Sequence, residues 1–256
     1  MINGHNVAAS EAKPARMNAS ARLPLLAKFN HVTSWIFDLD NTLYPPDSGL
    51  WPAIEDRITL YLIEHSGLDG ASARALQRYY YQQHGTTLRG LVDEDGIEPD
   101  HFLDFVHDID RSDLAPNPAL AEEIARLPGR KLIFTNGSRK HALATVEQLG
   151  LGGLFEDAFD IVAAGLAPKP RPEAYDAFLA AHAVDPAEAA MFEDIAKNLV
   201  APRARGMTTV LVTGKPGRID HRQPHDREAA PAFVDFITDD LSDFLARVNG
   251  ELALKP

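Results

Sequence analysis

The sequence contains no cysteine, which excludes disulfide bonds, thiolate zinc sites and a cysteine nucleophile. It also has no apolar run near the roughly 20 residues that a transmembrane helix needs. Residues 1–30 lack the basic start and the apolar core of a signal peptide. From these absences we expect a cytoplasmic protein with no membrane partner.

Positive charge is also scarce. The 25 Lys and Arg residues are outnumbered by 37 Asp and Glu residues, which gives a formal net charge of −12. Such an excess of acid repels nucleic acid polymers and anionic membranes at long range, so neither is an expected partner. An anionic small molecule would need cations gathered locally around its site. Residues 1–27 show no sustained periodicity, and we expect a flexible N-terminal extension there.

What the sequence does contain is a series of short apolar runs rich in β-branched and aromatic residues. They cover residues 32–37, 131–134, 160–163, 190–192, 208–212 and 233–237. Helical patterns lie between several of them, at residues 118–127, 140–149 and 172–182. Buried strands that alternate with helices predict an α/β fold with a doubly wound parallel sheet, a Rossmann-like core. Ligands of such sheets bind beyond the carboxyl ends of the strands.

Polar residues follow the first four predicted strands. In chain order they are Asp38 to Thr42, Thr135 to Gly137, Lys169 and the pair Glu193-Asp194. One polar strand end has an ordinary explanation, because Asp, Asn and Thr favour turns and helix caps. Four strand ends of complementary chemistry predict one shared site.

The chemistry of this set fits phosphoryl transfer, which needs an in-line nucleophile and neutralised phosphate oxygens. We predict Asp38 as a covalent nucleophile. Asp38 and Asp194 can hold Mg²⁺ together with a backbone carbonyl, since Mg²⁺ prefers oxygen ligands. Lys169 supplies a second positive charge, and the Thr135 hydroxyl can donate to the phosphate oxygens.

Asp40 is the predicted general acid and base. It follows Asp38 by two positions, which in an extended stretch puts both side chains on one side of the chain. We expect the neighbouring carboxylates to favour its protonated form, so that it can protonate the leaving oxygen. It would later deprotonate the water that hydrolyses the aspartyl phosphate.

These motifs, in this order, resemble the haloacid dehalogenase-like hydrolase superfamily over residues 32–245. The resemblance implies that Asp38 is the nucleophile and Asp40 the acid and base, with Thr135 and Lys169 holding phosphate and balancing charge. It also implies a Mg²⁺ cofactor, whose ligands we place among Asp38, Asp40, Glu193 and Asp194. The family usually carries Asp where this chain has Glu193, so which acid contacts the metal directly stays open.

Residues 46–117 have helical apolar patterns and lie between the first two motifs. By position the resemblance implies a small helical cap domain, inserted after the first strand, that closes over the site and selects the substrate. The alternative is an insertion that only packs. We therefore divide the chain into the extension, a catalytic core of residues 28–45 and 118–256, and the cap of residues 46–117.

A narrower resemblance points to the pyrimidine 5′-nucleotidase family. It rests on Asn41-Thr42-Leu43-Tyr44-Pro45, Tyr80 with residues 85–91, Val106-His107-Asp108, residues 134–137, and residues 169–175. It implies hydrolysis of a small phosphate monoester such as UMP or CMP by a monomer or a homodimer. Asn136 and Gly137 are predicted to bind substrate. Arg89 either adds positive charge near the anion or pairs with acids on the cap surface.

Three alternatives remain from the sequence. A sugar phosphatase or phosphomutase of the same superfamily would need the same acid. A haloacid dehalogenase also uses an aspartate nucleophile, but a halide leaves without a proton, and such enzymes typically lack the second aspartate found here as Asp40. A phosphoacceptor switch would hold phosphate on Asp38 without turnover, which Asp40 opposes by activating water.

Overall fold

The computed structural model describes residues 25–215 and 231–254. The predicted flexible extension therefore lies outside the described residues, except for its last three positions, where helix α1 (Leu25–Phe29) begins. None of the helices in the described ranges is both long enough and apolar enough to span a membrane.

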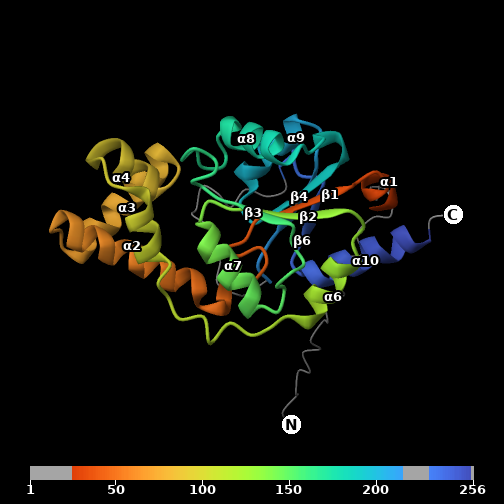
Figure 1. Cartoon of the computed structure of the whole chain (residues 1–256), viewed down its shortest axis with the longest axis horizontal. Coiled ribbons are helices and arrows are strands. Elements are labelled where there is room, and N and C mark those ends of the chain that lie inside the picture. Colours follow the sequence, from red (N-terminus) through yellow and green to blue (C-terminus); the bar gives the residue numbers. More distant parts are fainter. Residues whose placement is uncertain (1–24, 216–230, 255–256) are drawn as a thin grey trace, which may run out of the picture.

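The predicted sheet is confirmed as a six-stranded parallel sheet with the order β3-β2-β1-β4-β5-β6 (Figure 1). Its strands are β1 (Ser34–Phe37), β2 (Arg130–Phe134), β3 (Asp157–Phe159), β4 (Ala189–Glu193), β5 (Thr208–Val212) and β6 (Phe236–Thr238). Along the chain, β2 and β3 are added on one side of β1, and β4, β5 and β6 are then added on its other side. The topology therefore switches between β1 and β4, which is where a doubly wound sheet opens a crevice for ligands.

The third strand is where the prediction was wrong. Residues 160–163 were expected to be extended, but β3 ends at Phe159. The reason is Asp160, whose carboxylate accepts from the backbone N–H groups of Arg139 at 2.8 Å and Ala163 at 2.8 Å. An Asp that bonds to nearby backbone N–H groups favours a turn over a strand.

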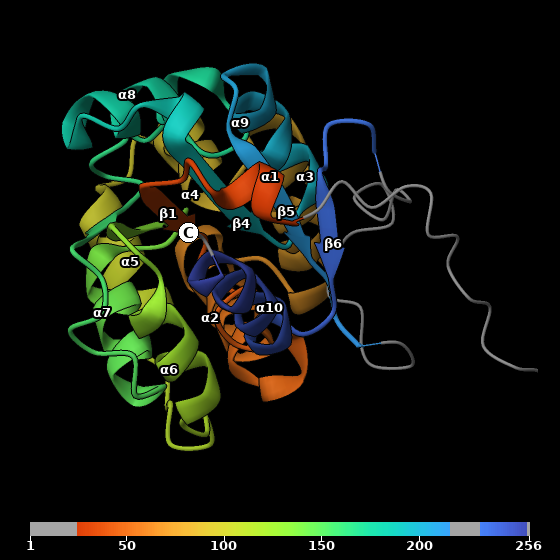
Figure 2. The same ribbon diagram turned by 90° about the vertical axis from the view of Figure 1, so that its right-hand side faces the viewer.

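Helices cover both faces of the sheet (Figure 2). These are α6 (Pro118–Arg126), α7 (Arg139–Gln148) and α10 (Leu241–Ala253) on one face, and α8 (Pro172–His182) and α9 (Val200–Ala204) on the other. Side chains alternate along β1: Trp35 and Phe37 join the apolar core under α6, α7 and α10, while Ile36 joins the core under α8. This alternation is the period of a strand that is buried on both faces.

A helical insertion separates β1 from β2. It consists of α2 (Leu50–Ser66), α3 (Gly70–His84), α4 (Thr87–Asp95) and α5 (Pro99–Val106), and it lies to one side of the sheet (Figure 1). It has an apolar cluster of its own, in which Tyr61, Tyr80 and Leu91 are buried. Ile161, in the turn after β3, also joins this cluster, so the insertion packs against the sheet domain.

Candidate active site

A cavity of about 540 Å³ lies between the carboxyl end of the sheet and the helical insertion. Both parts of the chain contribute to its walls. From the sheet side come Asp38, Asp40, Thr135, Lys169 and Asp194, and from the insertion Gln77, Arg78 and Tyr81. The structure therefore brings the four polar strand ends of the sequence to one place.

Asp38 is the residue that directly follows β1. Its backbone N–H donates to Phe192 O of β4 at 2.9 Å, which fixes the backbone at the switch point. Its carboxylate is buried and accepts from Lys169 Nζ at 2.6 Å on Oδ1 and from the Thr42 hydroxyl at 3.1 Å on Oδ2. Both oxygens are therefore held in a defined orientation.

Lys169 is 2% exposed and bridges two carboxylates. Its ammonium lies 2.6 Å from Asp38 Oδ1 and 2.7 Å from Glu193 Oε2, and it also donates to Phe134 O at 2.8 Å. Burial by itself lowers the pKa of Lys169, but the two carboxylates outweigh burial and raise it, so the side chain stays charged.

Asn136 holds the segment that carries Lys169. The Asn136 side chain accepts from the Lys169 backbone N–H at 2.8 Å and donates to the Lys169 carbonyl at 3.2 Å. Although Asn136 lines the cavity, both polar atoms of its amide are used in positioning Lys169.

Asp38, Glu193 and Asp194 form a buried acidic trio. One carboxylate oxygen from each lies within 4.8 Å of the others, an arrangement that could hold a metal ion. Burial and the neighbouring carboxylates raise the pKa of Asp38 to about 7, that of Glu193 to about 7 and that of Asp194 to about 8. Crowded buried acids of this kind are stabilised as carboxylates by a bound cation.

Asn198 lines the same cavity and supports the interpretation of the acidic trio as a metal site. It is 6% exposed, and its Oδ1 has no hydrogen-bond partner among the described residues. Buried carbonyl oxygens are almost always paired with a protein group, water or ion. The unpaired Asn198 oxygen and the carboxylates of the acidic trio are therefore the kind of oxygen ligands that a divalent cation binds.

The two acids of the Glu193-Asp194 pair have different surroundings. Glu193 Oε2 accepts from Lys169, and its Oε1 accepts from the Ile195 backbone N–H at 3.2 Å. Both Glu193 oxygens thus have protein partners, and one of its tasks is to hold the lysine.

Thr135 follows β2 and is 1% exposed. Its Oγ1 accepts from the Gly137 backbone N–H at 2.9 Å. Because that bond uses the oxygen as an acceptor, the hydroxyl hydrogen stays available to donate to a ligand in the cavity.

Asp40 differs from the expectation in one respect. We expected its protonated form to be favoured, but its pKa is lowered. Burial raises the pKa of Asp40, and this effect is outweighed by His141 and Tyr44, whose Nε2 and hydroxyl lie 2.9 Å and 2.6 Å from Asp40 Oδ1. In the absence of substrate, Asp40 is therefore a carboxylate.

For Arg89 the structure favours the second of the two interpretations. Its Nε donates to Asp93 at 2.8 Å on the surface of α4, and Arg89 is not among the described residues that line the cavity. An i, i+4 spacing on one helix brings such pairs together without any ligand.

Several residues around the site were given no role from the sequence: Thr42, Tyr44, His107, Arg111, His141 and Lys197. Thr42, Tyr44 and His107 lie in the motifs that carry the family resemblance, and Thr42 and Tyr44 follow the first strand, so the rule that singled out Asp38 and Asp40 could have assigned them a role. Lys197 Nζ lies 2.9 Å from the Tyr81 hydroxyl, a contact between core and insertion that no local pattern indicates.

Comparison with known proteins agrees with this geometry. The family model described as haloacid dehalogenase-like hydrolase matches residues 35–206. The chain belongs to the haloacid dehalogenase-like hydrolases. The match begins in β1 and ends just before β5, so it includes the four strand ends that build the cavity.

Among curated proteins, this hydrolase is similar to "Phosphate metabolism protein 8" of Saccharomyces cerevisiae. The two are 30% identical over an alignment of 134 residues, which covers 48% of this chain and 41% of the yeast protein. The hydrolase therefore matches less than half of the length of that relative.

Solved structures share the fold. The L-2-haloacid dehalogenase from Xanthobacter autotrophicus has a TM-score of 0.53 at 20% identity, covering 86% of this chain and 99% of that chain. A HAD phosphatase from Thermococcus onnurineus has a TM-score of 0.52 at 16% identity, covering 83% and 96%. The HAD-hydrolase YfnB from Bacillus subtilis bound to magnesium has a TM-score of 0.52 at 16% identity, covering 85% and 99%. At these identities the likeness shows the fold alone.

Proposed function

We propose that this hydrolase is a Mg²⁺-dependent phosphatase that cleaves phosphate monoesters through an aspartyl phosphate on Asp38. The observation that carries the proposal is the arrangement around Asp38 and Asp40. A nucleophilic carboxylate held by Lys169 and Thr42 lies two positions from a second carboxylate held by His141 and Tyr44. The names of a yeast relative and of a structural neighbour, which mention phosphate metabolism and phosphatase, agree with this chemistry.

Asp38 and Asp194 are the proposed direct ligands of Mg²⁺, with Asn198 beside them. Glu193 is not a proposed direct ligand, because its two oxygens already accept hydrogen bonds from Lys169 and from the Ile195 backbone N–H. When bound, Mg²⁺ supplies positive charge that lets two anions, Asp38 and the phosphate, approach each other. If Asp40 contributes a ligand to Mg²⁺, we expect its backbone carbonyl to do so, because its side chain is already bonded to His141 and Tyr44.

In the first step, an Asp38 oxygen attacks phosphorus, the ester P–O bond breaks, and Asp40 gives a proton to the leaving oxygen. Lys169 and the Thr135 hydroxyl stabilise the charge on the phosphoryl oxygens. In the second step, Asp40 accepts a proton from water as the water attacks the phosphorus, which releases phosphate and regenerates Asp38. An anionic phosphate beside Asp40 favours the protonated carboxyl that the first step needs.

The helical insertion, within residues 46–117, is the proposed cap. It supplies the cavity wall opposite the acids, including Gln77, Arg78 and Tyr81. The insertion also contributes apolar side chains such as Trp51 and Ile54. A wall that combines polar, apolar and aromatic side chains is suited to a ribose and a base, and the proposed substrate is a pyrimidine nucleoside 5′-monophosphate such as UMP or CMP. Three consecutive tyrosines, Tyr79, Tyr80 and Tyr81, lie on α3, and of these only Tyr81 lines the cavity and can face such a base.

The test is phosphate release from a panel of nucleotides, sugar phosphates and small phosphoesters, with Mg²⁺ and with a chelator. We expect multiple turnovers that require Mg²⁺, with UMP and CMP the best substrates. Faster turnover of sugar phosphates throughout would replace the nucleotidase assignment by a sugar phosphatase. Phosphate retained on the protein in stoichiometric amount would favour the switch, and halide release from haloacids without phosphatase activity would favour the dehalogenase.

A further inference from the structure

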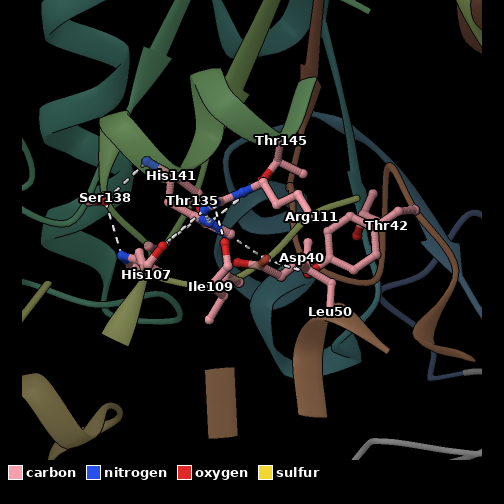
Figure 3. A network of polar contacts seen from close by, with 12 residues as sticks. Asp40, Thr42, Leu50, His107, Ile109, Arg111, Thr135, Ser138, His141 and Thr145 are labelled. Atoms are coloured by element: carbon pink, nitrogen blue, oxygen red, sulfur yellow. Dashed lines mark hydrogen bonds and ion pairs between the residues drawn. The ribbon is translucent and has the colours of Figure 1, made fainter. Parts of the chain in front are cut away.

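Asp40 receives two hydrogen bonds on the same oxygen. His141 Nε2 lies 2.9 Å from Asp40 Oδ1 (Figure 3). The Tyr44 hydroxyl donates to the same oxygen at 2.6 Å. His141 comes from α7 and lies 101 positions from Asp40 in the sequence. The other oxygen, Oδ2, takes part in neither bond. The carboxylate is thus fixed by one oxygen, and the second remains for proton transfer.

The position of the hydrogen on the His141 ring follows from the partner of its other nitrogen. Arg111 Nη2 lies 2.8 Å from His141 Nδ1. A guanidinium only donates hydrogen bonds and stays charged in proteins, so His141 Nδ1 must accept with its lone pair. The ring hydrogen is therefore on Nε2, where it points at Asp40. Arg111 Nε also donates to the Thr145 hydroxyl at 3.3 Å, which fixes the guanidinium against α7.

Arg111 lies in the segment that leads from the insertion back to the sheet. Its guanidinium donates to the carbonyls of His107 at 3.2 Å and Ile109 at 3.1 Å, so the segment folds around its own arginine. The same segment places the His107 ring against that of His141, with centroids 4.3 Å apart and planes at 8°. The orientation of His141 thus depends on residues at the base of the insertion (Figure 3).

His107 completes the support as a neutral ring. Burial lowers its pKa to about 3, the Arg111 guanidinium acts in the same direction, and the Asp40 carboxylate opposes both. Its Nδ1 lies 3.0 Å from the Ser138 hydroxyl. A Cβ at Gly137 would lie 3.3 Å from His141 Cδ2 and 3.5 Å from His107 Nε2, so glycine leaves room for the stacked pair.

We propose that Arg111 and His141 are positioning residues for the general acid and base. Arg111 fixes the His141 tautomer that carries hydrogen on Nε2, and this N–H holds Asp40 Oδ1 so that Oδ2 faces the ester oxygen. The inference rests on the proposed phosphatase function. It assigns the base of the insertion a part in orienting the group that moves the proton.

The test compares a poor leaving group with a good one. A nucleoside alkoxide, from UMP or the best alkyl phosphate of the panel, needs a proton to depart, whereas p-nitrophenolate does not. We expect Asp40→Asn to lower kcat/KM, which reports the step in which the alcohol departs and not the later hydrolysis of the aspartyl phosphate, far more for the alkyl ester than for p-nitrophenyl phosphate. His141→Asn and Arg111→Met should show the same selectivity, with kcat/KM for the alkyl ester lowered by about tenfold or more. Proton transfer by a positioned group provides about 10²- to 10⁴-fold in rate, and a misplaced Asp40 should lose part of it.

Two matched variants separate positioning from packing. The amide of Gln reaches the place of His Nε2, while that of Asn reaches only the place of Nδ1. His141→Gln should therefore keep part of the kcat/KM for the alkyl ester that His141→Asn loses. Lys140→Gln removes an exposed hydrogen bond of 2.7 Å between Lys140 on α7 and Asp104 in the insertion. It controls for the loss of a contact between α7 and the insertion that does not involve Asp40. We expect it to behave like the wild type.

The possible failures are distinguishable. If the wild type hydrolyses no phosphate ester, the proposed function fails. If Asp40→Asn shows the leaving-group effect on kcat/KM but His141→Asn and Arg111→Met do not, or if these two variants lower kcat/KM equally for both esters, the positioning role is overturned. His141 is buried, so its variants could fail to fold. Arg111 is partly exposed, and Arg111→Met then tests the positioning role by itself.

Discussion

The ammonium of Lys169 lies 2.6 Å from Oδ1 of Asp38, at the point where the sheet changes direction. The same ammonium lies 2.7 Å from Glu193. A single buried cation therefore holds both the proposed nucleophile, which follows β1, and Glu193 at the end of the neighbouring strand β4. The stability and the chemistry of the site depend on the same group.

Lys169→Met is expected to lower both stability and turnover. Removing one partner of a buried ion pair leaves uncompensated charge and costs about 3 to 5 kcal/mol of unfolding free energy. Urea denaturation measures this cost. Lys140→Gln, which breaks an exposed ion pair with Asp104, should leave the denaturation midpoint where it was. A wild-type midpoint for Lys169→Met would contradict the proposed electrostatic role.

Thr135→Val is expected to lower kcat by about 10²- to 10³-fold, the usual loss when one donor to a developing oxyanion is removed. Valine has nearly the shape of threonine but no hydroxyl. Thr135→Ser keeps the hydroxyl and should recover most of the activity. Steady-state kinetics with phosphate release checks both. Equal activity of the Val and Ser variants would show that the hydroxyl contributes nothing.

The buried acids predict how pH affects the metal-free protein. The pKa of Asp38 is raised from 3.8 to about 7 and that of Asp194 from 3.8 to about 8, mainly by burial. The folded state thus binds protons more tightly than the unfolded chain. This stabilisation is complete below the ordinary pKa and is lost as the pH rises through about 7 to 8.

Urea denaturation with a chelator, from about pH 4 to pH 9, measures this loss, since the slope reports the difference in bound protons and should vanish above about pH 8. Asp194→Asn should reduce the loss, and Mg²⁺ should stabilise the wild type more at the high end of the range than at the low end. A metal effect that grows as the pH falls would contradict the assignment of these acids as ligands.

Tyr81→Ala is expected to raise KM for UMP by about tenfold, or about 1.4 kcal/mol, because the ring is a wall of the cavity opposite the acids. Its hydroxyl and ring both contact Lys197, with Nζ 4.4 Å from the ring centroid. Tyr79→Ala, at a ring that is 46% exposed, is the control. If both variants raise KM equally, Tyr81 has no special part in binding.

The sheet and its chemistry were predictable from the sequence because each depends on local patterns. The buried strands appear as apolar runs, and the polar residues after β1, β2 and β4 lie at their carboxyl ends in the structure. The prediction for β3 was wrong because the Asp160 side chain competes for backbone N–H groups just where the apolar run starts.

The surroundings of Asp40 could not be predicted in the same way. Its pKa depends on His141, which is 101 positions away, and the tautomer of His141 depends on Arg111, which is 30 positions from it. These contacts exist only after the insertion has returned to the sheet. A rule based on neighbouring carboxylates in the sequence therefore gave the wrong direction for Asp40.

The most direct test of the account is phosphate release by Asp38→Asn, measured with Mg²⁺ and the best ester of the panel. The variant removes the nucleophile with almost no change in shape, and Glu122→Gln, at an exposed acid on α6, is the matched control. The account predicts a folded Asp38→Asn protein without measurable turnover and a control with wild-type turnover. Normal phosphate release by a folded Asp38→Asn variant would contradict it.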